Sequence, residues 1–145
     1  MAAAFSLGAD AVWVGTRFIC ATESAAPARH KDAVIKARAL DTIKTLVVSG
    51  RPLRTLNTDY IKSWEVDRKD MIQKLCDQGI VPMQYDFKQA EEKNEPISIA
   101  KVFPLLMGQC AGHITEVKPA AAIIEEMMTD CLNTIKQNQR LIAKL

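Results

Sequence analysis

A short apolar run that ends in glycine is the feature that most constrains the fold of this chain. The run Ala11–Val14 is followed directly by Gly15, Thr16 and Arg17. Four apolar residues with β-branched members are typical of a strand that is buried on both faces of a parallel sheet. We therefore predict the last turns of a helix over Ala2–Leu7, a turn, a strand over Ala11–Val14, and a loop of a size that suits an anion.

The loop after the predicted strand is a candidate phosphate site. Loops that follow the last strands of an α/β barrel commonly bind phosphate. Backbone N–H groups supply such a site, and Gly15 would let the phosphate approach closely. The Thr16 hydroxyl can add a donor. The competing interpretation is that Gly15 only turns the strand into a loop, and Arg17 can equally bind the phosphate or form a salt bridge at the rim.

Composition excludes two classes of partner. The net charge is +2 and aromatic residues make up 6% of the chain, so neither a basic field nor a stacking platform for nucleic acid is expected. No apolar stretch approaches the ~18–20 residues of a membrane span. With 48% hydrophobic and 25% charged residues, the chain resembles an ordinary globular protein that binds neither nucleic acid nor membrane.

The four cysteines point to a reducing compartment such as the cytoplasm. They form no C-x-x-C pair, and no histidine lies at ligand spacing, so we expect no metal site. Cys76 and Cys131 lie on the apolar faces of helical patterns and are predicted to be reduced thiols in the core.

Local signals predict the remaining elements. Turn residues between two β-prone runs predict a hairpin, and capping residues and prolines predict helix ends. The expected elements are a helix over Ala26–Ala39, strands over Ile43–Val48 and Leu53–Leu56, a helix from Thr58 to about Gln78 that ends at Gly79, an exposed charged stretch over Lys88–Glu95, a helix over Pro96–Met107, a loop over Gly108–Gly112, and a helix that starts at Pro119.

The last predicted helix carries an apolar stripe at helical spacing. Its members are Ile123, Ile124, Met127, Met128, Cys131, Leu132 and Ile135. Such a stripe most often packs in a core. If the surface that it packs against is absent, it becomes an exposed patch through which the chain can self-associate.

Five segments of the chain together resemble the nitronate monooxygenase family, also called 2-nitropropane dioxygenase-like. The matching segments are Leu7–Phe18 with Ala21–Ser24, His30–Val34, Ser49–Arg54, Met107–Gly112 and Pro119–Ala121. They occur in the family's order and cover nearly the whole chain. The resemblance implies an FMN-dependent oxidoreductase that oxidises alkyl nitronates with molecular oxygen.

The resemblance also implies a fold and its division. The fold class would be α/β: the C-terminal part of a TIM (β/α)8 barrel, with its last strand and helix, and then a mostly helical small subdomain with a short hairpin. Residues 1–40 would end the FMN-binding barrel, 41–112 would form the small α+β subdomain, and 113–145 the C-terminal helix. The barrel's earlier part, which carries the family's proposed catalytic histidine, would lie upstream of this chain.

Site residues follow from the same resemblance. Gly15 and Thr16 would hold the FMN phosphate through their backbone N–H groups, with Trp13 and Val14 beside the flavin. Gln109, in a glycine-flanked loop, would approach the flavin or the substrate. No catalytic residue is expected within the chain. His113 is interpreted as exposed or structural, and His30 as a surface residue.

Two alternatives stay open. Flavin-dependent enoyl reductases share the same loop, so the reaction could be a reduction that uses NAD(P)H. In a different class, the chain could be a non-catalytic remnant or an α-helical interaction module, because one strand of eight cannot close a barrel.

Overall fold

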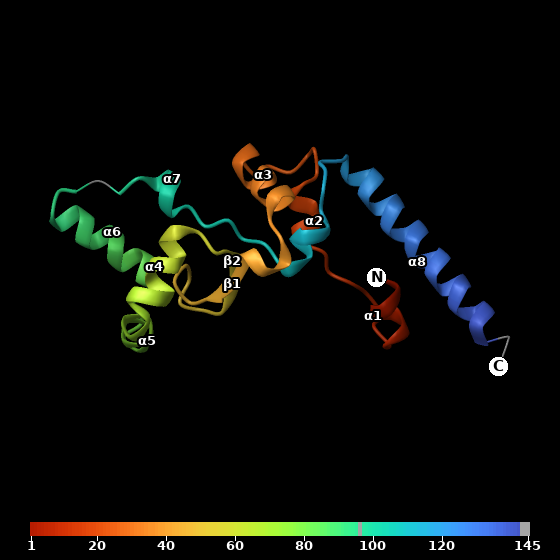
Figure 1. Ribbon diagram of the computed structural model, residues 1–145, viewed down its shortest axis with the longest axis horizontal. Coiled ribbons are helices and arrows are strands. Elements are labelled where there is room, and N and C mark those ends of the chain that lie inside the picture. The colour runs from red at the N-terminus through yellow and green to blue at the C-terminus, as the bar shows by residue number, and fades with distance from the viewer. Residues whose placement is uncertain (96, 143–145) are drawn as a thin grey trace.

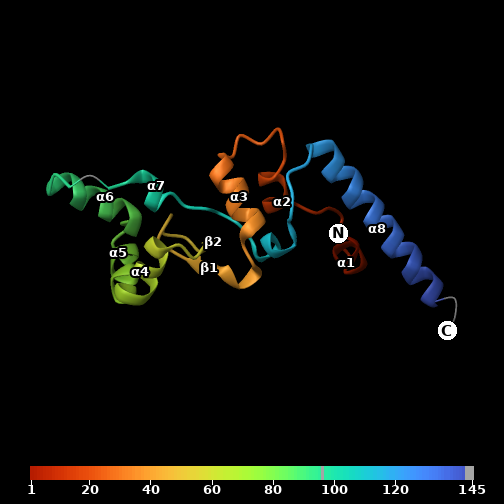
Figure 2. The same cartoon turned by 45° about the horizontal axis from the view of Figure 1, so that its top comes forward.

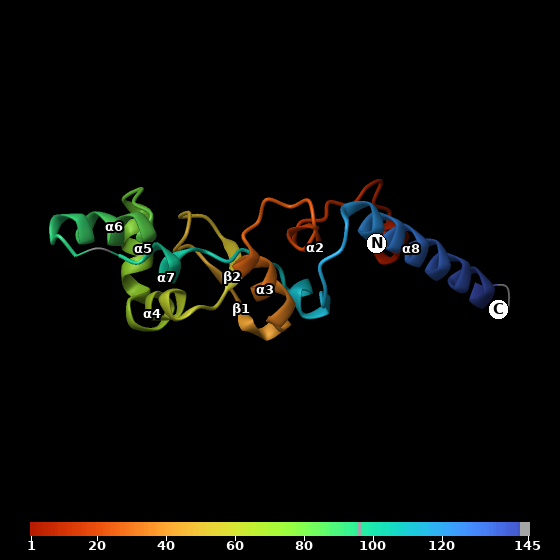
Figure 3. The same ribbon diagram turned by 90° about the horizontal axis from the view of Figure 1, so that it is seen from above.

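The computed structural model describes residues 1–95 and 97–142, and these form an elongated, mostly helical α/β structure. Figure 1 shows the hairpin with α4, α5, α6 and α7 at one end, α2 and α3 in the middle, and the long helix α8 with α1 at the other end. Views turned by 45° and 90° about the long axis show the same order of elements from the side and from above (Figures 2 and 3).

The N-terminal region contains a helix, as predicted, but not the predicted strand. Helix α1 spans Ala2–Ser6, and helix α2 spans Thr16–Ile19. Between them, Ala11–Val14 runs as a coil with no strand pairing, so the expected strand is wrong. A strand needs a neighbour for its backbone N–H and C=O groups. No other segment of the described chain runs beside these residues.

The hairpin is confirmed, although its first strand ends at Thr45 and does not reach Val48 as predicted. Helix α3 spans Ala28–Lys36, starts directly after Pro27, and leads through the short 3-10 turn η1 (Ala39–Asp41) into the sheet. Strands β1 (Thr42–Thr45) and β2 (Leu53–Leu56) pair antiparallel, with Thr42 opposite Leu56 and Thr45 opposite Leu53. The turn between them contains Gly50 at φ +69°, a backbone conformation that glycine adopts without strain.

The helix expected from Thr58 to Gln78 is two helices. Helix α4 spans Asp59–Asp67 and α5 spans Lys69–Asp77, and the break falls at Arg68, which has φ −127° and ψ 23°. The start and end agree with the sequence. The Thr58 hydroxyl caps α4 by accepting a hydrogen bond from the Ile61 N–H at 3.4 Å. Gly79 ends α5 at φ +73°.

Three further elements differ from expectation. Helix α6 spans Pro82–Glu92 with its proline in the first turn, and this helix was not expected. It contains most of the charged stretch Lys88–Glu95, which is mostly exposed as predicted. Helix α7 is limited to Ile99–Val102, far shorter than the expected helix over Pro96–Met107, whose first residue lies outside the described residues. The expected loop over Gly108–Gly112 contains the 3-10 turn η2, Gln109–His113.

Helix α8 spans Ala120–Ile142 directly after Pro119, as the sequence predicts. Its first turn is fixed by the loop after α2: the Glu23 carboxylate accepts a hydrogen bond from the Ala120 N–H at 2.8 Å. Next to it, Thr22 N–H donates to Lys118 O at 2.9 Å. No helix of the described chain combines the length and apolar character that crossing a membrane requires.

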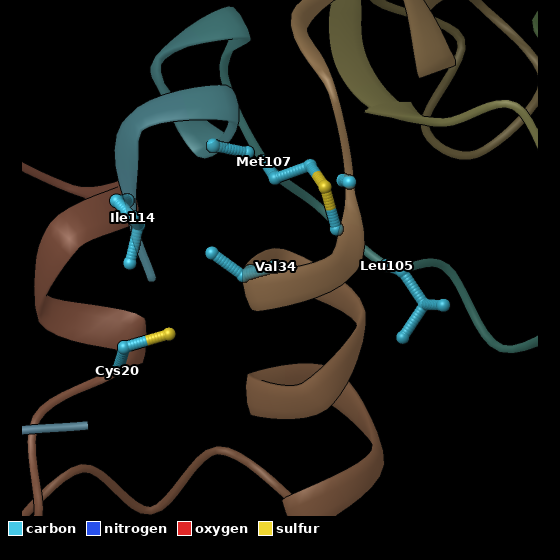
Figure 4. Packing of buried hydrophobic residues seen from close by; sticks show 7 residues of the cluster. Cys20, Val34, Leu105, Met107 and Ile114 are labelled. Atoms are coloured by element: carbon cyan, nitrogen blue, oxygen red, sulfur yellow. The ribbon is translucent and has the colours of Figure 1, made fainter. Parts of the chain in front are cut away.

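Two separate clusters of buried side chains hold the structure. One joins the hairpin to α4 and α5 through Val47, Ile61, Trp64, Ile72 and Leu75. The other lies in the middle of the molecule and consists of Cys20, Val34, Ala37, Leu105, Met107, Ala111 and Ile114. Figure 4 shows the side chains of Cys20 and Ile114 directed toward α3, which carries Val34. This central cluster brings the region after Gly15 together with the segment around Gly108.

Candidate functional site

Two segments that are far apart in the sequence meet beside the predicted phosphate loop. The Gly108 N–H donates a hydrogen bond to the Thr16 hydroxyl oxygen at 2.9 Å, across 92 residues of chain. Thr16 is the first residue of α2, and Gly15 immediately precedes that helix. The structure therefore brings together Gly15, Thr16 and the Met107–Gly108 segment.

The segment before Gly108 is held firmly by the hairpin. The Thr55 hydroxyl donates to Leu105 O at 2.9 Å, and the Leu56 N–H donates to the same carbonyl at 2.9 Å. The Met107 N–H donates to Arg54 O at 3.3 Å. These bonds align residues 105–107 beside β2, so that Gly108 emerges at the start of α2.

His30 fixes the same segment from the other side. Its Nε2–H donates to the carbonyl oxygen of Leu106 at 2.8 Å, and the side chain is buried. The interpretation of His30 as a surface residue is therefore wrong. A helical pattern that starts after Pro27 does not reveal which face is covered, because the covering residues come from a segment more than 70 positions away.

The meeting point is a shallow pocket that is open to solvent. Its lining consists of Gly15, Thr16, Ile19, Arg54, Leu106, Met107 and Gly108. Arg54 was not among the residues expected at the site, although it belongs to the Ser49–Arg54 turn that resembles the family. Its Nη1 donates to the carbonyl and the hydroxyl of Thr42, at 3.2 and 3.1 Å, and these bonds orient the guanidinium.

The chemistry of this pocket suits an anionic group. The first N–H groups of α2 have no partner within the helix, which is the usual basis of anion binding at such a position. A Cβ built on Gly15 would meet nothing within 4 Å, so the backbone is open to approach. The Thr16 hydroxyl accepts from Gly108, so its own hydrogen is free to be donated, and Arg54 adds a positive charge.

The other expected site residues lie outside the pocket lining. The Trp13 side chain is 99% exposed, Val14 is half-buried, and Gln109 is exposed next to Gly108. Arg17 donates from Nη1 to the carbonyl oxygen of Glu116 at 3.1 Å. This contact is neither the phosphate contact nor the salt bridge that the sequence suggested for Arg17. His113 is exposed, in agreement with its interpretation.

The cysteines do not form a reactive centre in the described residues. Burial raises the pKa of the Cys20 thiol, although the nearby charges of Arg17 and Lys31 act in the opposite direction. A thiol with a raised pKa stays protonated and behaves as a small apolar side chain. Cys131 is buried as predicted, Cys76 is half-buried, and all four cysteines are free.

A second polar cluster, between α4 and α6, has a structural character. The Asp86 carboxylate accepts hydrogen bonds from Tyr60 Oη at 3.0 Å, Trp64 Nε1 at 2.9 Å and Arg68 Nη1 at 2.8 Å. The Arg68 guanidinium also stacks on Trp64, 3.6 Å from the ring centroid. Because the carboxylate already has three donors, this cluster joins two helices and leaves little capacity for a ligand.

Comparison with known proteins relates the whole chain to one family. A family model described as nitronate monooxygenase matches residues 1–130. A protein of Mycobacterium tuberculosis that is named a monooxygenase is 27% identical over 147 residues, which cover 99% of this chain and 39% of that protein. The nitronate monooxygenase of Pseudomonas aeruginosa is 44% identical over 54 residues, 37% of this chain and 15% of that protein.

A solved structure supports the relationship at the level of fold. FabK from Thermotoga maritima superimposes with a TM-score of 0.67 and 31% sequence identity, over 96% of this chain and 42% of FabK. The chain thus spans about two fifths of the length of the M. tuberculosis relative and of FabK.

Proposed function

Because this chain belongs to the nitronate monooxygenase family, we propose that it supplies the flavin-phosphate corner of an FMN-dependent oxidoreductase that oxidises alkyl nitronates with molecular oxygen. The observation that carries the proposal is the hydrogen bond between Gly108 and Thr16. It unites the two family-like segments, Leu7–Phe18 and Met107–Gly112, in one anion-compatible pocket.

The residues of this chain would act by binding and orienting. Backbone N–H groups at Gly15 and Thr16 would donate to phosphate oxygens, and the Thr16 hydroxyl and the Arg54 guanidinium would add donors from two other directions. When bound, FMN supplies the redox chemistry between the nitronate and oxygen, as cofactors generally do. Trp13 and Val14 would lie beside the flavin, and Gln109 would approach the flavin or the substrate.

The proposal includes a TIM barrel as the surrounding fold. In it, Ala11–Val14 would gain strand neighbours, and its apolar side chains would be covered. The catalytic base would come from a part of the enzyme that precedes these residues. The described pocket alone would cover only the phosphate end of the cofactor.

A chimaera tests this proposal. This chain would replace the matching segment of the M. tuberculosis relative, and the purified protein would be examined for flavin absorbance and for oxygen consumption on adding an alkyl nitronate. We expect flavin retention and nitronate-dependent oxygen uptake. A folded, colourless chimaera, obtained while the intact relative retains flavin in the same preparation, would contradict the proposal.

The 145-residue chain by itself should not bind FMN tightly. A phosphate held by one open pocket, with the flavin ring uncovered, lacks most of the burial that a cofactor site provides. Titration of flavin fluorescence should therefore show no saturable quenching at micromolar concentrations. Saturable quenching together with nitronate-dependent oxygen consumption would show that this chain is a complete enzyme.

Two alternatives are separated by the same chimaera. A flavin-dependent enoyl reductase would consume NAD(P)H with an enoyl substrate and would show no oxygen uptake with nitronates. A non-catalytic interaction module is favoured by one specific observation, the exposed apolar residues Ile124, Met128 and Leu132 on α8. That function predicts association without flavin in any context.

A further inference from the structure

Helix α8 has one broad apolar face, and only part of it is covered. Ile123 and Cys131 are buried on the covered side, where α1 and α2 lie against the helix. Along the other edge of this face, Ile124, Met128 and Leu132 are 53%, 48% and 52% exposed. These three residues repeat every four positions and form one stripe, called here the outer stripe. Figures 1 and 3 show α8 projecting at the end of the molecule, with α1 beside it.

Charges are distributed unevenly along this helix. Glu125, Glu126 and Asp130 lie in its first half, and Lys136 and Arg140 lie in its second half. Glu126 already pairs with Lys118 at 3.0 Å. At 3.6 residues per turn, Glu125 and Lys136 are separated by about 20° around the helix axis, so both lie along the same edge of the outer stripe.

This pattern fits a second copy of the same helix in the opposite direction. We propose that the outer stripe is the interface of an antiparallel α8–α8 dimer of this chain. In an isologous twofold pair, residues equally far from the axis on either side meet across the interface. With the axis at the level of Asp130 along the helix, Glu125 of one copy lies opposite Lys136 of the second copy, and Met128 lies opposite Leu132.

The same register pairs Met128 with Leu132 and Glu125 with Lys136, and it places Ile124 against the aliphatic stem of Lys136. The pairs Met128–Leu132 and Glu125–Lys136 are centred within half a residue of each other, so no shift is needed to bring both together. In a parallel twofold pair, the edges that carry Glu125 and Lys136 would instead lie on opposite sides of the interface, and these charges would not meet. Ion pairs between the two copies therefore form only in the antiparallel arrangement, which favours it.

The contact is short, so the dimer should be concentration-dependent. Residues 125–136 extend over about 17 Å of helix, which is less than a standard stable interface requires. Two symmetric ion pairs at its edge set the direction of the helices more than the affinity. Reversing one charge turns both attractive pairs into repulsive pairs, and we expect this to raise the dimer dissociation constant about tenfold.

Sedimentation equilibrium of the 145-residue chain over a range of concentrations tests the dimer. Met128→Glu, which places a charge in the outer stripe, should abolish association. Glu125→Lys should weaken it about tenfold, and so should Lys136→Glu. The double variant E125K/K136E should restore the wild-type dissociation constant, because opposite charges again face each other in the antiparallel pair. Circular dichroism of each variant checks that α8 is retained.

The control is Asp130→Lys. It makes the same change of charge as Glu125→Lys but lies about 160° around the helix from the centre of the outer stripe. It should leave the dissociation constant within twofold of wild type. A monomeric wild-type chain at all concentrations would overturn the proposal and point to another occupant of the stripe. Association that is insensitive to both single charge reversals, or that the double variant fails to restore, would overturn the antiparallel register.

Discussion

The backbone N–H of Gly108 and the hydroxyl of Thr16 are joined by a hydrogen bond of 2.9 Å. Thr16 begins a helix near the N-terminus, and Gly108 follows the segment that lies beside β2. The bond therefore connects the two family-like segments directly. It also orients the Thr16 hydroxyl, whose own hydrogen is the donor available to an anion in the pocket.

Replacing Thr16 tests this connection. Thr16→Val keeps the shape of the side chain but removes the acceptor for Gly108 N–H. We expect the free energy of unfolding to fall by about 1 kcal/mol. Urea unfolding of the 145-residue chain measures the loss. Thr16→Ser is the matched variant, since it retains the hydroxyl and should lie closer to wild type. Equal stability of the Val and Thr forms would show that the bond contributes nothing.

Replacing Gly15 tests the phosphate pocket. In the chimaera with the M. tuberculosis relative, Gly15→Asp should abolish flavin retention, because it places a negative charge where the phosphate is expected. The fold itself should tolerate the change: Gly15 has φ −103° and ψ −70°, and a Cβ there meets nothing within 4 Å. Absorbance of the purified protein gives the flavin content. Ala25→Asp, in an exposed loop of the same region, is the control, and normal flavin content in both variants would refute the assignment.

The two histidines should behave differently. His30→Ala removes a buried side chain and the donor to Leu106 O, and we expect a loss of about 1–3 kcal/mol in the free energy of unfolding. His113→Ala, at an exposed position, should stay within about 0.5 kcal/mol of wild type. Urea unfolding compares the two variants.

In the chimaera, His113→Ala should also keep nitronate turnover within about tenfold, since a general base contributes ~10²–10⁴-fold. A larger loss would make His113 the base.

The raised pKa of Tyr60 predicts that the folded protein loses stability in alkali. Burial raises the pKa of Tyr60 above its usual value, and the neighbouring Asp86 carboxylate raises it further, although the hydrogen bond with Trp64 acts in the opposite direction. In the unfolded chain a tyrosine ionises near pH ~10. Above that pH the folded state binds more protons than the unfolded state, so the free energy of unfolding falls as the pH rises.

Urea unfolding at pH 8 and at pH 10.5 measures this effect. Tyr60→Phe should be less stable than wild type at pH 8, because it lacks the hydrogen bond to Asp86, and the difference should shrink at pH 10.5. Tyr85→Phe, in the same apolar cluster, is the control and should retain the wild-type decline, since Tyr60 is intact. A difference between wild type and Tyr60→Phe that is constant with pH would contradict the assignment.

Much of the local structure is determined by the sequence itself. Thr58 caps α4, Gly79 ends α5, Pro119 precedes α8, and a turn containing Gly50 joins the two strands, each at the expected place. These signals act within one turn of backbone, through a hydroxyl acceptor, a fixed φ angle or a missing side chain. The sequence motifs also identified the family, because they preserve residue types and order and do not depend on the contacts between segments.

Tertiary structure decided what depends on distant partners. Ala11–Val14 has strand composition but forms no strand, since backbone pairing requires a neighbour that the described residues do not provide. The helical pattern from Thr58 to Gln78 breaks at Arg68, whose guanidinium stacks on Trp64 and binds Asp86 of α6. The burial of His30 and the position of Arg54 in the pocket depend on residues 105–108. Such contacts join positions tens of residues apart, and no local pattern of side chains encodes them.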